Sequence, residues 1–317
     1  MIKSGAAVLH LEQVSKSYGK FAAVKDLGFR VAPGEIFGFL GPNGAGKTST
    51  IRMMLGILEP DHGKILLFGK PWSREALSKV GYLPEERGLY KDMKAAAVVA
   101  YFATLKGLSY FEARRRARAI LDRFELSAFA NKKVSSLSKG MAQKVQLAAA
   151  IAHDPEFLIL DEPFSGLDPL NQQVLEQVIL EQAKRGCAVL FSTHTMQHAE
   201  RLCDRLLIMT KGQKAFDGTL ADARASQPRR IRIEADRELT FLAQSAAVLS
   251  VTPPHPPSTF WEVLLKPGAE PHQVLEACFK AGVRINKFDA SEMSLHEIFV
   301  AIAGVDPEAD AQGSVQP

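Results

Sequence analysis

The stretch GPNGAGKTST, which begins at Gly41, constrains this 317-residue chain more than any other. It follows the apolar run EIFGFL, residues 35–40, which is typical of a buried strand, and it precedes KTSTIRMMLGIL, whose apolar residues recur at helical spacing. Within it, Gly41, Gly46, Lys47 and Thr48 fit the pattern G-x-x-x-x-G-K-[ST]. In that pattern backbone N–H groups and a helix N-terminus converge on phosphate oxygens. The loop is therefore predicted to bind a nucleoside triphosphate.

The loop also supplies side chains for the phosphates and for a metal ion. Lys47 carries a point charge suited to the β- and γ-phosphates, and the Thr48 hydroxyl is suited to a magnesium ion that accompanies the nucleotide. Every residue of the loop is therefore a candidate nucleotide contact: Gly41, Pro42, Asn43, Gly44, Ala45, Gly46, Lys47, Thr48 and Ser49.

A second strand ends in acidic residues. FLILDEP, residues 157–163, has four apolar residues, as in a parallel sheet buried on both faces, followed by Asp161 and Glu162. Asp161 is predicted to hold the magnesium ion through water. Glu162 is predicted to act as the general base on the attacking water, because successive residues at a strand end project differently.

A third stretch, LSKGM at residues 137–141, opens the helical pattern KGMAQKVQLAAAIAH. Together with the two phosphate motifs, it makes residues 9–217 resemble the nucleotide-binding subunit of the ABC transporter ATPases, whose signature is usually written LSGGQ. The resemblance implies an α/β P-loop NTPase core with a helical subdomain at about residues 86–150, where a transmembrane partner usually docks. It also implies ATP as the nucleotide, with Mg²⁺.

In this family two subunits pair head to tail over two ATP molecules, so the signature of one copy faces the γ-phosphate held by the other. The resemblance assigns that contact to Ser138 and the Gly140 backbone, which begin a helix. Lys139 and Met141 depart from the usual residues. Asp168, in SGLD, matches the loop that crosses the dimer interface.

Three further positions take roles from the resemblance. His194, which ends VLFSTH, matches the histidine that reaches the γ-phosphate and the attacking water. Tyr18, in SKSYGKFAAV, matches the aromatic residue that stacks on adenine. Glu85, in VGYLPEERGLY, occupies the position of a glutamine thought to contact the magnesium ion and to report the γ-phosphate to the permease.

The composition limits the alternatives. The net charge is +4, from 39 basic and 35 acidic residues, which is too balanced to indicate a nucleic-acid partner. The basic runs RRRAR from Arg114 and PRR from Pro228 lie beside acidic residues and are interpreted as solvated faces. The three cysteines are far apart and indicate neither disulfides nor zinc. No stretch approaches the ~18 apolar residues that span a bilayer.

The C-terminal part has a different pattern. A linker begins at ADARASQPRR, and the runs that follow predict strand, helix, two strands, helix and strand, which is a ferredoxin-like α+β order. We therefore expect an ATPase domain at residues 1–225, a small accessory domain at 228–303 and a disordered tail at 304–317. A small C-terminal domain of this kind resembles that of ABC subunits that pair with separate export permeases, including sodium and drug exporters.

These observations predict an ATP-hydrolysing subunit that dimerises and drives a separate membrane permease, with export favoured over import. The chain would then lie at the cytoplasmic face of the cell membrane, held there through the permease. One alternative is an ABC ATPase that acts on ribosomes or DNA, although a second ATPase core or a long coiled-coil insertion is absent from the sequence. A non-catalytic regulatory subunit is disfavoured because Lys47, Asp161, Glu162 and His194 are all present.

Overall fold

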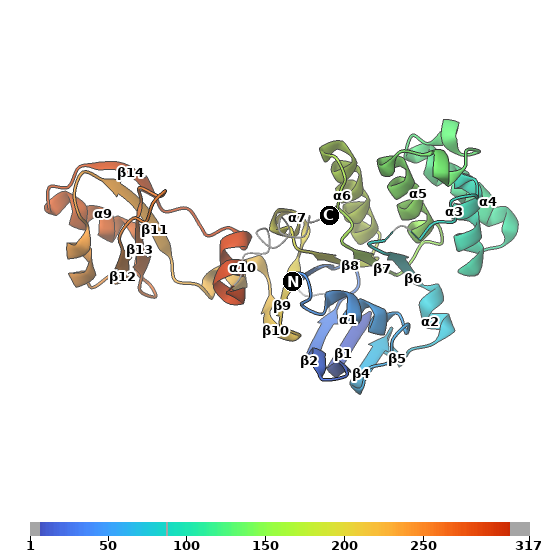
Figure 1. Ribbon diagram of the computed structural model, residues 1–317, viewed down its shortest axis with the longest axis horizontal. Helices are drawn as coiled ribbons and strands as arrows, with labels where there is room; N and C mark the ends of the chain where they lie inside the picture. Colours follow the sequence, from blue (N-terminus) through green and yellow to red (C-terminus); the bar gives the residue numbers. More distant parts are fainter. Residues whose placement is uncertain (1–6, 87, 305–317) are drawn as a thin grey trace. The chain divides into compact units, whose positions relative to one another are not determined.

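The computed structural model describes residues 7–86 and 88–304, which form two compact units (Figure 1). The first unit contains the residues up to Thr219 together with the described residues from Ile302, and the second is Leu220–Ala301. The tail expected at 304–317 lies outside the described residues except for Gly304. The first unit contains two sheets and the second unit contains one.

A six-stranded sheet forms the centre of the first unit. Its strands are β3 (Ile36–Leu40), β6 (Val80–Leu83), β7 (Phe157–Asp161), β8 (Ala188–Thr193), β9 (Arg205–Thr210) and β10 (Gln213–Gly218). They lie in the order β10-β9-β3-β8-β7-β6, and every neighbouring pair is parallel except the antiparallel pair β9 and β10. Because β8 lies between β3 and β7, the residues that follow these three strands meet at one edge of the sheet.

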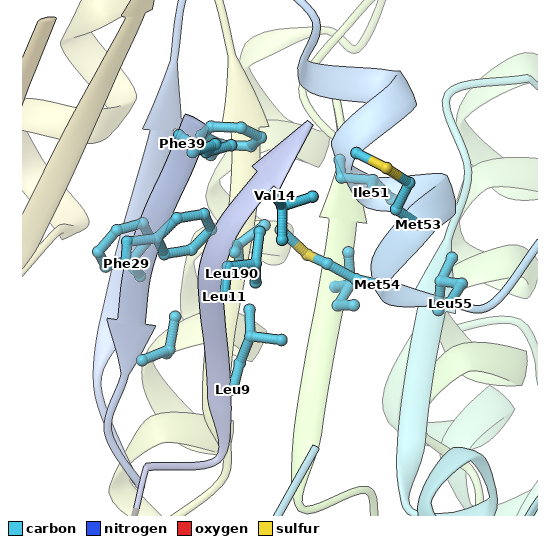
Figure 2. Close-up of a cluster of buried hydrophobic side chains, with 14 of the residues drawn as sticks. Leu9, Leu11, Val14, Phe29, Phe39, Ile51, Met53, Met54, Leu55 and Leu190 are labelled. Atoms are coloured by element: carbon cyan, nitrogen blue, oxygen red, sulfur yellow. The ribbon is translucent and has the colours of Figure 1, made fainter. Parts of the chain in front are cut away.

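A smaller antiparallel sheet packs against this one. Its strands are β1 (Leu9–Tyr18), β2 (Phe21–Val31), β4 (His62–Leu67) and β5 (Lys70–Pro71), in the order β2-β1-β4-β5. Leu9 and Leu11 of β1 share one core with Phe39, Leu190 and the buried side of α1 (Lys47–Met54) (Figure 2). The alternate residues of the central strands are buried as well, and α6 (Pro169–Lys184) packs against β3 and β8. The continuous apolar runs of these strands therefore reflect burial on both faces.

The helix α1 is shorter than its pattern indicates. The apolar spacing of KTSTIRMMLGIL continues to Leu58, but α1 ends at Met54. Gly56 adopts a positive φ of 65°, which favours glycine, and the N–H groups of Ile57 and Leu58 donate back to the Arg52 carbonyl. Two further helices of this unit are α2 (Arg74–Ser78) and α7 (Met196–Leu202).

Three helices lie between β6 and β7 in the chain, where the helical subdomain is expected. They are α3 (Ala95–Leu105), α4 (Tyr110–Arg123) and α5 (Lys139–Ile151), joined by the short 3₁₀ turns Ser127–Phe129 and Val134–Ser136. Each packs on the other two. Within residues 7–86 and 88–304, no helix is both long enough and apolar enough to cross a membrane.

The second unit contains a ferredoxin-like sheet. Its strands are β11 (Arg230–Ala235), β12 (Val248–Thr252), β13 (Trp261–Leu265) and β14 (Ile285–Asp289), all antiparallel in the order β12-β13-β11-β14. Its helices are α8 (Leu220–Ala225), α9 (Pro271–Lys280) and α10 (Leu295–Ala303). The core gathers alternate strand residues and one face of α9.

One expected helix of this unit is only a 3₁₀ turn. ELTFLAQSAAV, residues 238–248, was predicted to be helical, but the turn covers Thr240–Gln244 alone. Ser245 has extended backbone angles, and its hydroxyl accepts a hydrogen bond from the Ala247 N–H at 3.4 Å. Local hydrogen bonds of this kind compete with helix propagation.

Candidate nucleotide-binding site

The glycine loop joins β3 to α1 and packs tightly against its neighbours. Gly46 has a φ of 103°, and a Cβ atom there would lie 2.4 Å from the Ala23 carbonyl oxygen. A Cβ atom at Gly41 would lie 2.5 Å from the Met209 carbonyl oxygen. Only glycine fits at these two positions, because the obstructing atoms belong to the backbone. The Gly46 carbonyl then accepts from the Thr50 N–H at 3.0 Å, which begins the helix.

Lys47 is buried at the start of α1. Its Nζ donates to the carbonyl oxygens of Gly41, at 2.6 Å, and Pro42, at 3.3 Å. It also lies 3.4 Å from Glu162 Oε1, and the two side chains are only 7% and 8% exposed. The lysine charge is therefore held inside the loop, close to the acidic end of β7.

Ser192 at the end of β8 joins the two acidic residues. Its hydroxyl donates to Asp161 Oδ1 at 2.5 Å and accepts from the Glu162 N–H at 2.9 Å. Burial raises the pKa of Asp161, and the hydrogen bond from Ser192 partly opposes that effect. Glu162 leaves the strand with a positive φ of 45°, so its backbone turns away from the course of β7.

Glu162 and His194 form a second contact across the same strand ends. His194 Nδ1 lies 2.9 Å from Glu162 Oε2. Burial favours a raised pKa for Glu162, but the bond with His194 and the charge of Lys47 outweigh burial and lower it. The bond with Glu162 raises the pKa of His194. Glu162 Oε1 is buried and has no hydrogen-bond partner among residues 7–86 and 88–304.

A cavity of about 290 Å³ lies over the glycine loop. It is lined by residues 42–49 together with Tyr18, Phe21, Ala23, Glu85 and Glu162. Glu85 is exposed at the edge of the cavity. Its pKa is raised, mainly by partial loss of hydration and then by the negative charges of Glu162 and Asp161. The loop residues, the aromatic residue and the acidic residues expected from the sequence thus come together in space.

Two aromatic side chains flank this cavity. The Tyr18 hydroxyl lies 3.4 Å from Ser49 Oγ, and the ring is about half exposed at the end of β1. Phe21, at the start of β2, is 63% exposed and was not anticipated from the sequence. The sequence could have indicated Phe21, because the Gly19-Lys20 pair is typical of a hairpin turn. In the structure these two residues form that turn, and Tyr18 pairs directly with Phe21.

Ser138, Gly140 and Asp168 are not among the residues that line this cavity. Ser138 caps α5 by accepting from the Met141 N–H at 3.3 Å, and Asp168 caps α6 by accepting from the Asn171 N–H at 3.0 Å. A Cβ atom at Gly140 would lie 2.6 Å from Asn171 Nδ2. These residues form a separate surface of the same chain, at the starts of two helices.

A larger cavity, of about 770 Å³, lies in the second unit. It is lined in part by arginines, but Arg229 already pairs with Glu270, at 2.6 Å, and Arg230 with Glu297. It has no glycine loop and no pair of strand-end carboxylates. The smaller cavity over residues 42–49 is therefore the better candidate for the nucleotide.

Known proteins match both parts of the chain. The ABC transporter family profile matches residues 24–165, and the C-terminal domain of DrrA1-3-like ATP-binding proteins matches residues 218–303. The ABC transporter ATP-binding protein YhaQ of Bacillus subtilis is 40% identical over 299 residues, which cover 94% of this chain and 99% of that protein. The chain belongs to the ABC transporter ATP-binding proteins.

Other ABC proteins extend this comparison. The Nod factor export ATP-binding protein I of Paraburkholderia xenovorans is 40% identical over 224 residues, covering 70% of this chain and 74% of that protein. A solved ATP-binding subunit of an ABC transporter superposes with a TM-score of 0.65 at 34% identity, covering 69% of this chain and 92% of its own. The expected fold, nucleotide binding and transport-coupled ATPase activity are thus confirmed. Such a subunit works in pairs and with a membrane permease.

The hydroxyl of Ser192 yields a testable prediction. Ser192→Ala removes the donor to Asp161 and the acceptor for the Glu162 N–H, both of which are buried. We expect the free energy of unfolding to fall by about 1–3 kcal/mol, since buried groups left without partners cost that much. Urea denaturation measures the change. Ser135→Ala, at an exposed serine, is the control, and an equal effect in both variants would contradict the assigned role of Ser192.

Proposed function

We propose that the chain binds Mg²⁺ and ATP over the glycine loop, hydrolyses ATP in a head-to-tail dimer with a second copy, and drives a separate permease that exports its substrate. The observation that carries this proposal is the meeting of Lys47, Asp161, Glu162 and His194 at one sheet edge. The domains we assign are an ATPase domain at residues 1–225, with its helical subdomain at about 86–150, and an accessory domain at 228–303.

The nucleotide is held by the backbone of the loop. Residues 41–49 carry the N–H groups that bind the phosphates, and Lys47 turns its ammonium group from the carbonyl oxygens of Gly41 and Pro42 toward the β- and γ-phosphates. Tyr18 stacks on the adenine. Its exposed ring beside Ser49 supports that role.

The oxygen ligands fit a magnesium ion. Thr48 offers a hydroxyl, and Asp161 and Glu85 offer carboxylates, which are hard donors of the kind Mg²⁺ prefers. The raised pKa values of both acids support this assignment, because a nearby cation would offset the cost of their negative charges. When bound, the ion neutralises charge on the phosphate oxygens.

Glu162 is the residue proposed to take the proton. Its lowered pKa keeps the carboxylate ionised, and its buried Oε1, 3.4 Å from Lys47 Nζ, accepts no hydrogen bond among the described residues and could accept one from the attacking water. His194 holds the other oxygen, Oε2, and so orients the base. The proton passes from water to Glu162 as the water oxygen attacks the γ-phosphorus and the bond to ADP breaks.

The second copy supplies the remaining contacts. Ser138, the Gly140 backbone and Asp168 lie at exposed starts of helices α5 and α6, away from the phosphate loop of their own chain. In a head-to-tail pair they would reach the nucleotide of the partner, where the positive end of α5 favours an anion.

Export is favoured by one relative, which carries the name of a Nod factor export ATP-binding protein. The permease would hold the chain at the cytoplasmic face of the cell membrane. The relatives named above are all transporter subunits, so the alternative of a ribosome- or DNA-acting ATPase has no support among them.

The partner can be identified directly. Gentle detergent extraction of the tagged chain, followed by mass spectrometry, should recover a membrane protein with many spanning helices and no ATPase motif. An untagged strain gives the background. Consistent recovery of ribosomes or DNA, with no such membrane protein, would refute the transport function.

Hydrolysis is tested by removing the proposed base. Glu162→Gln should retain ATP binding but lose hydrolysis by ~100-fold or more, because a positioned base contributes at least that much. Uncleaved ATP should then hold two copies together, so sedimentation with ATP should show a dimer for Glu162→Gln and mostly monomer for Lys47→Ala. Normal hydrolysis by Glu162→Gln would remove this residue from the mechanism.

The role of Glu85 is tested by restoring the usual amide. Glu85→Gln removes a negative charge that faces Asp161 and Glu162. We expect ATP affinity of the wild-type chain to depend more steeply on magnesium than that of Glu85→Gln, since the extra carboxylate repels the phosphates without the ion and attracts the ion when it is present. Calorimetry across a magnesium titration measures this. Superimposed curves would show that Glu85 does not sense the ion.

A further inference from the structure

Large apolar side chains are exposed at one end of the hairpin formed by α3 and α4. Phe111 is 83% exposed, Tyr110 is 59% exposed, and Leu105, at the end of α3, is 62% exposed. The turn between the helices has only four residues, 106–109, so all three lie at the same end of the hairpin. Figure 1 shows α3 and α4 at the outer edge of the first unit.

The fold does not require these aromatic rings. The buried side of α4 consists of Ala113, Ala117 and Leu121, which face the rest of the helical subdomain. Tyr110, three residues before Ala113, continues that row but is exposed at the end of the helix, and Phe111 lies outside the row. The two rings contact each other edge to face, with ring centroids 5.8 Å apart. The helix start needs only the Ser109 cap, which accepts from the Glu112 N–H at 3.3 Å. An exposed cluster of this size is typical of an interaction surface.

Positive charge accompanies the aromatic rings on one helix face. Tyr110, Arg114 and Arg118 follow each other at intervals of four residues, so they share a face of α4, with Phe111 beside them. Arg114 Nη1 donates to the Tyr110 hydroxyl at 2.9 Å, and its guanidinium lies 5.4 Å from the centre of that ring. Across residues 7–86 and 88–304, neither Arg114 nor Arg118 pairs with a carboxylate.

Two acidic residues lie at this face: Asp122, four residues after Arg118, accepts from the Ser127 hydroxyl, and Glu112 is neutralised by arginines. Glu112 accepts from Arg115 at 2.7 and 2.8 Å and from Arg116 at 2.8 Å. The hydrogen bond from Arg115 has the largest effect and that from Arg116 the next largest, and both lower the pKa of Glu112. With Asp122 counted, Arg114 and Arg118 leave one net positive charge on the face, and Arg114 lies next to the exposed rings.

We propose that this face, made of Leu105, Tyr110, Phe111, Arg114 and Arg118, binds the surface of a membrane that contains anionic lipids. Guanidinium groups bind lipid phosphates, and aromatic rings favour the interface between headgroups and acyl chains. The contact is shallow, because α4 is buried against its own subdomain on its other side. The inference rests on the proposed function only in placing the chain beside a membrane.

Vesicle flotation of the purified full-length chain tests this proposal. We expect binding to vesicles of phosphatidylcholine mixed with phosphatidylglycerol, and weak binding to phosphatidylcholine alone. The double variant Arg114→Gln, Arg118→Gln should bind the anionic vesicles about fivefold more weakly for each arginine removed. Phe111→Ser should weaken binding by about tenfold, because it removes an apolar ring from the interface.

Matched controls come from the same chain. Phe279→Ser removes another exposed phenylalanine, 66% exposed on α9, and Arg185→Gln removes an exposed arginine after α6. Both should bind as the wild type does. In addition, Phe111→Trp should gain fluorescence that brominated lipids quench, beyond any quenching of the wild-type chain with its native tryptophans.

The outcomes separate this proposal from the transport function. Equal binding to both vesicle types, no binding at all, or wild-type binding by the arginine and Phe111 variants would overturn the lipid contact. ATP hydrolysis, measured in parallel, should be unchanged in all of these variants, because none of the residues lines the nucleotide cavity. A chain that hydrolyses ATP and recovers a permease but ignores anionic vesicles would refute this inference alone.

Discussion

The buried ammonium group of Lys47 is the charge around which the first unit is organised. A charge removed from water costs several kcal/mol unless partners replace the lost hydration. Two carbonyl oxygens of the glycine loop and the Glu162 carboxylate supply those partners. Each lies at a strand end: the carbonyls follow β3, and Glu162 follows β7. The parallel order of β3, β8 and β7 is therefore what makes a buried lysine tolerable here.

The same order explains why the place of the candidate phosphate site in the sheet could be anticipated from the sequence. Buried parallel strands have continuous apolar runs, and a polar motif that ends such a run must lie at the carboxyl edge of the sheet. Gly46 was expected from the motif, and the structure gives the reason: its positive φ and the short contact that a Cβ atom would make with the Ala23 carbonyl exclude a side chain. The ferredoxin-like strand order of the second unit followed from alternation in RIRIEA and FWEVLL, which the burial of Ile231 and Val263 reflects.

Other features of the structure depend on contacts that the spacing of residues along the sequence does not reveal. Ser192 belongs to an apolar strand, and nothing in VLFSTH indicates that its hydroxyl bridges Asp161 and the Glu162 N–H from another strand. The α-helix predicted at residues 238–248 does not form, because the spacing of the apolar residues does not reveal that the backbone of Ser245 is extended. The basic run at Arg114 was interpreted as a solvated face, and Arg114 and Arg118 are exposed, but the exposed aromatic residues beside them become evident only from their accessible surface.

The small contacts between the starts of α5 and α6 have a mechanical consequence. Asn171 holds Asp168 through its N–H and side-chain amide, and the same amide lies against Gly140. The ammonium group of Lys139 lies beside Gly166 in the loop before α6. The first turn of α5 and the loop before α6 are therefore linked through Asn171 and Lys139, so a rotation of α5 about its first turn would be felt at that loop in the same chain.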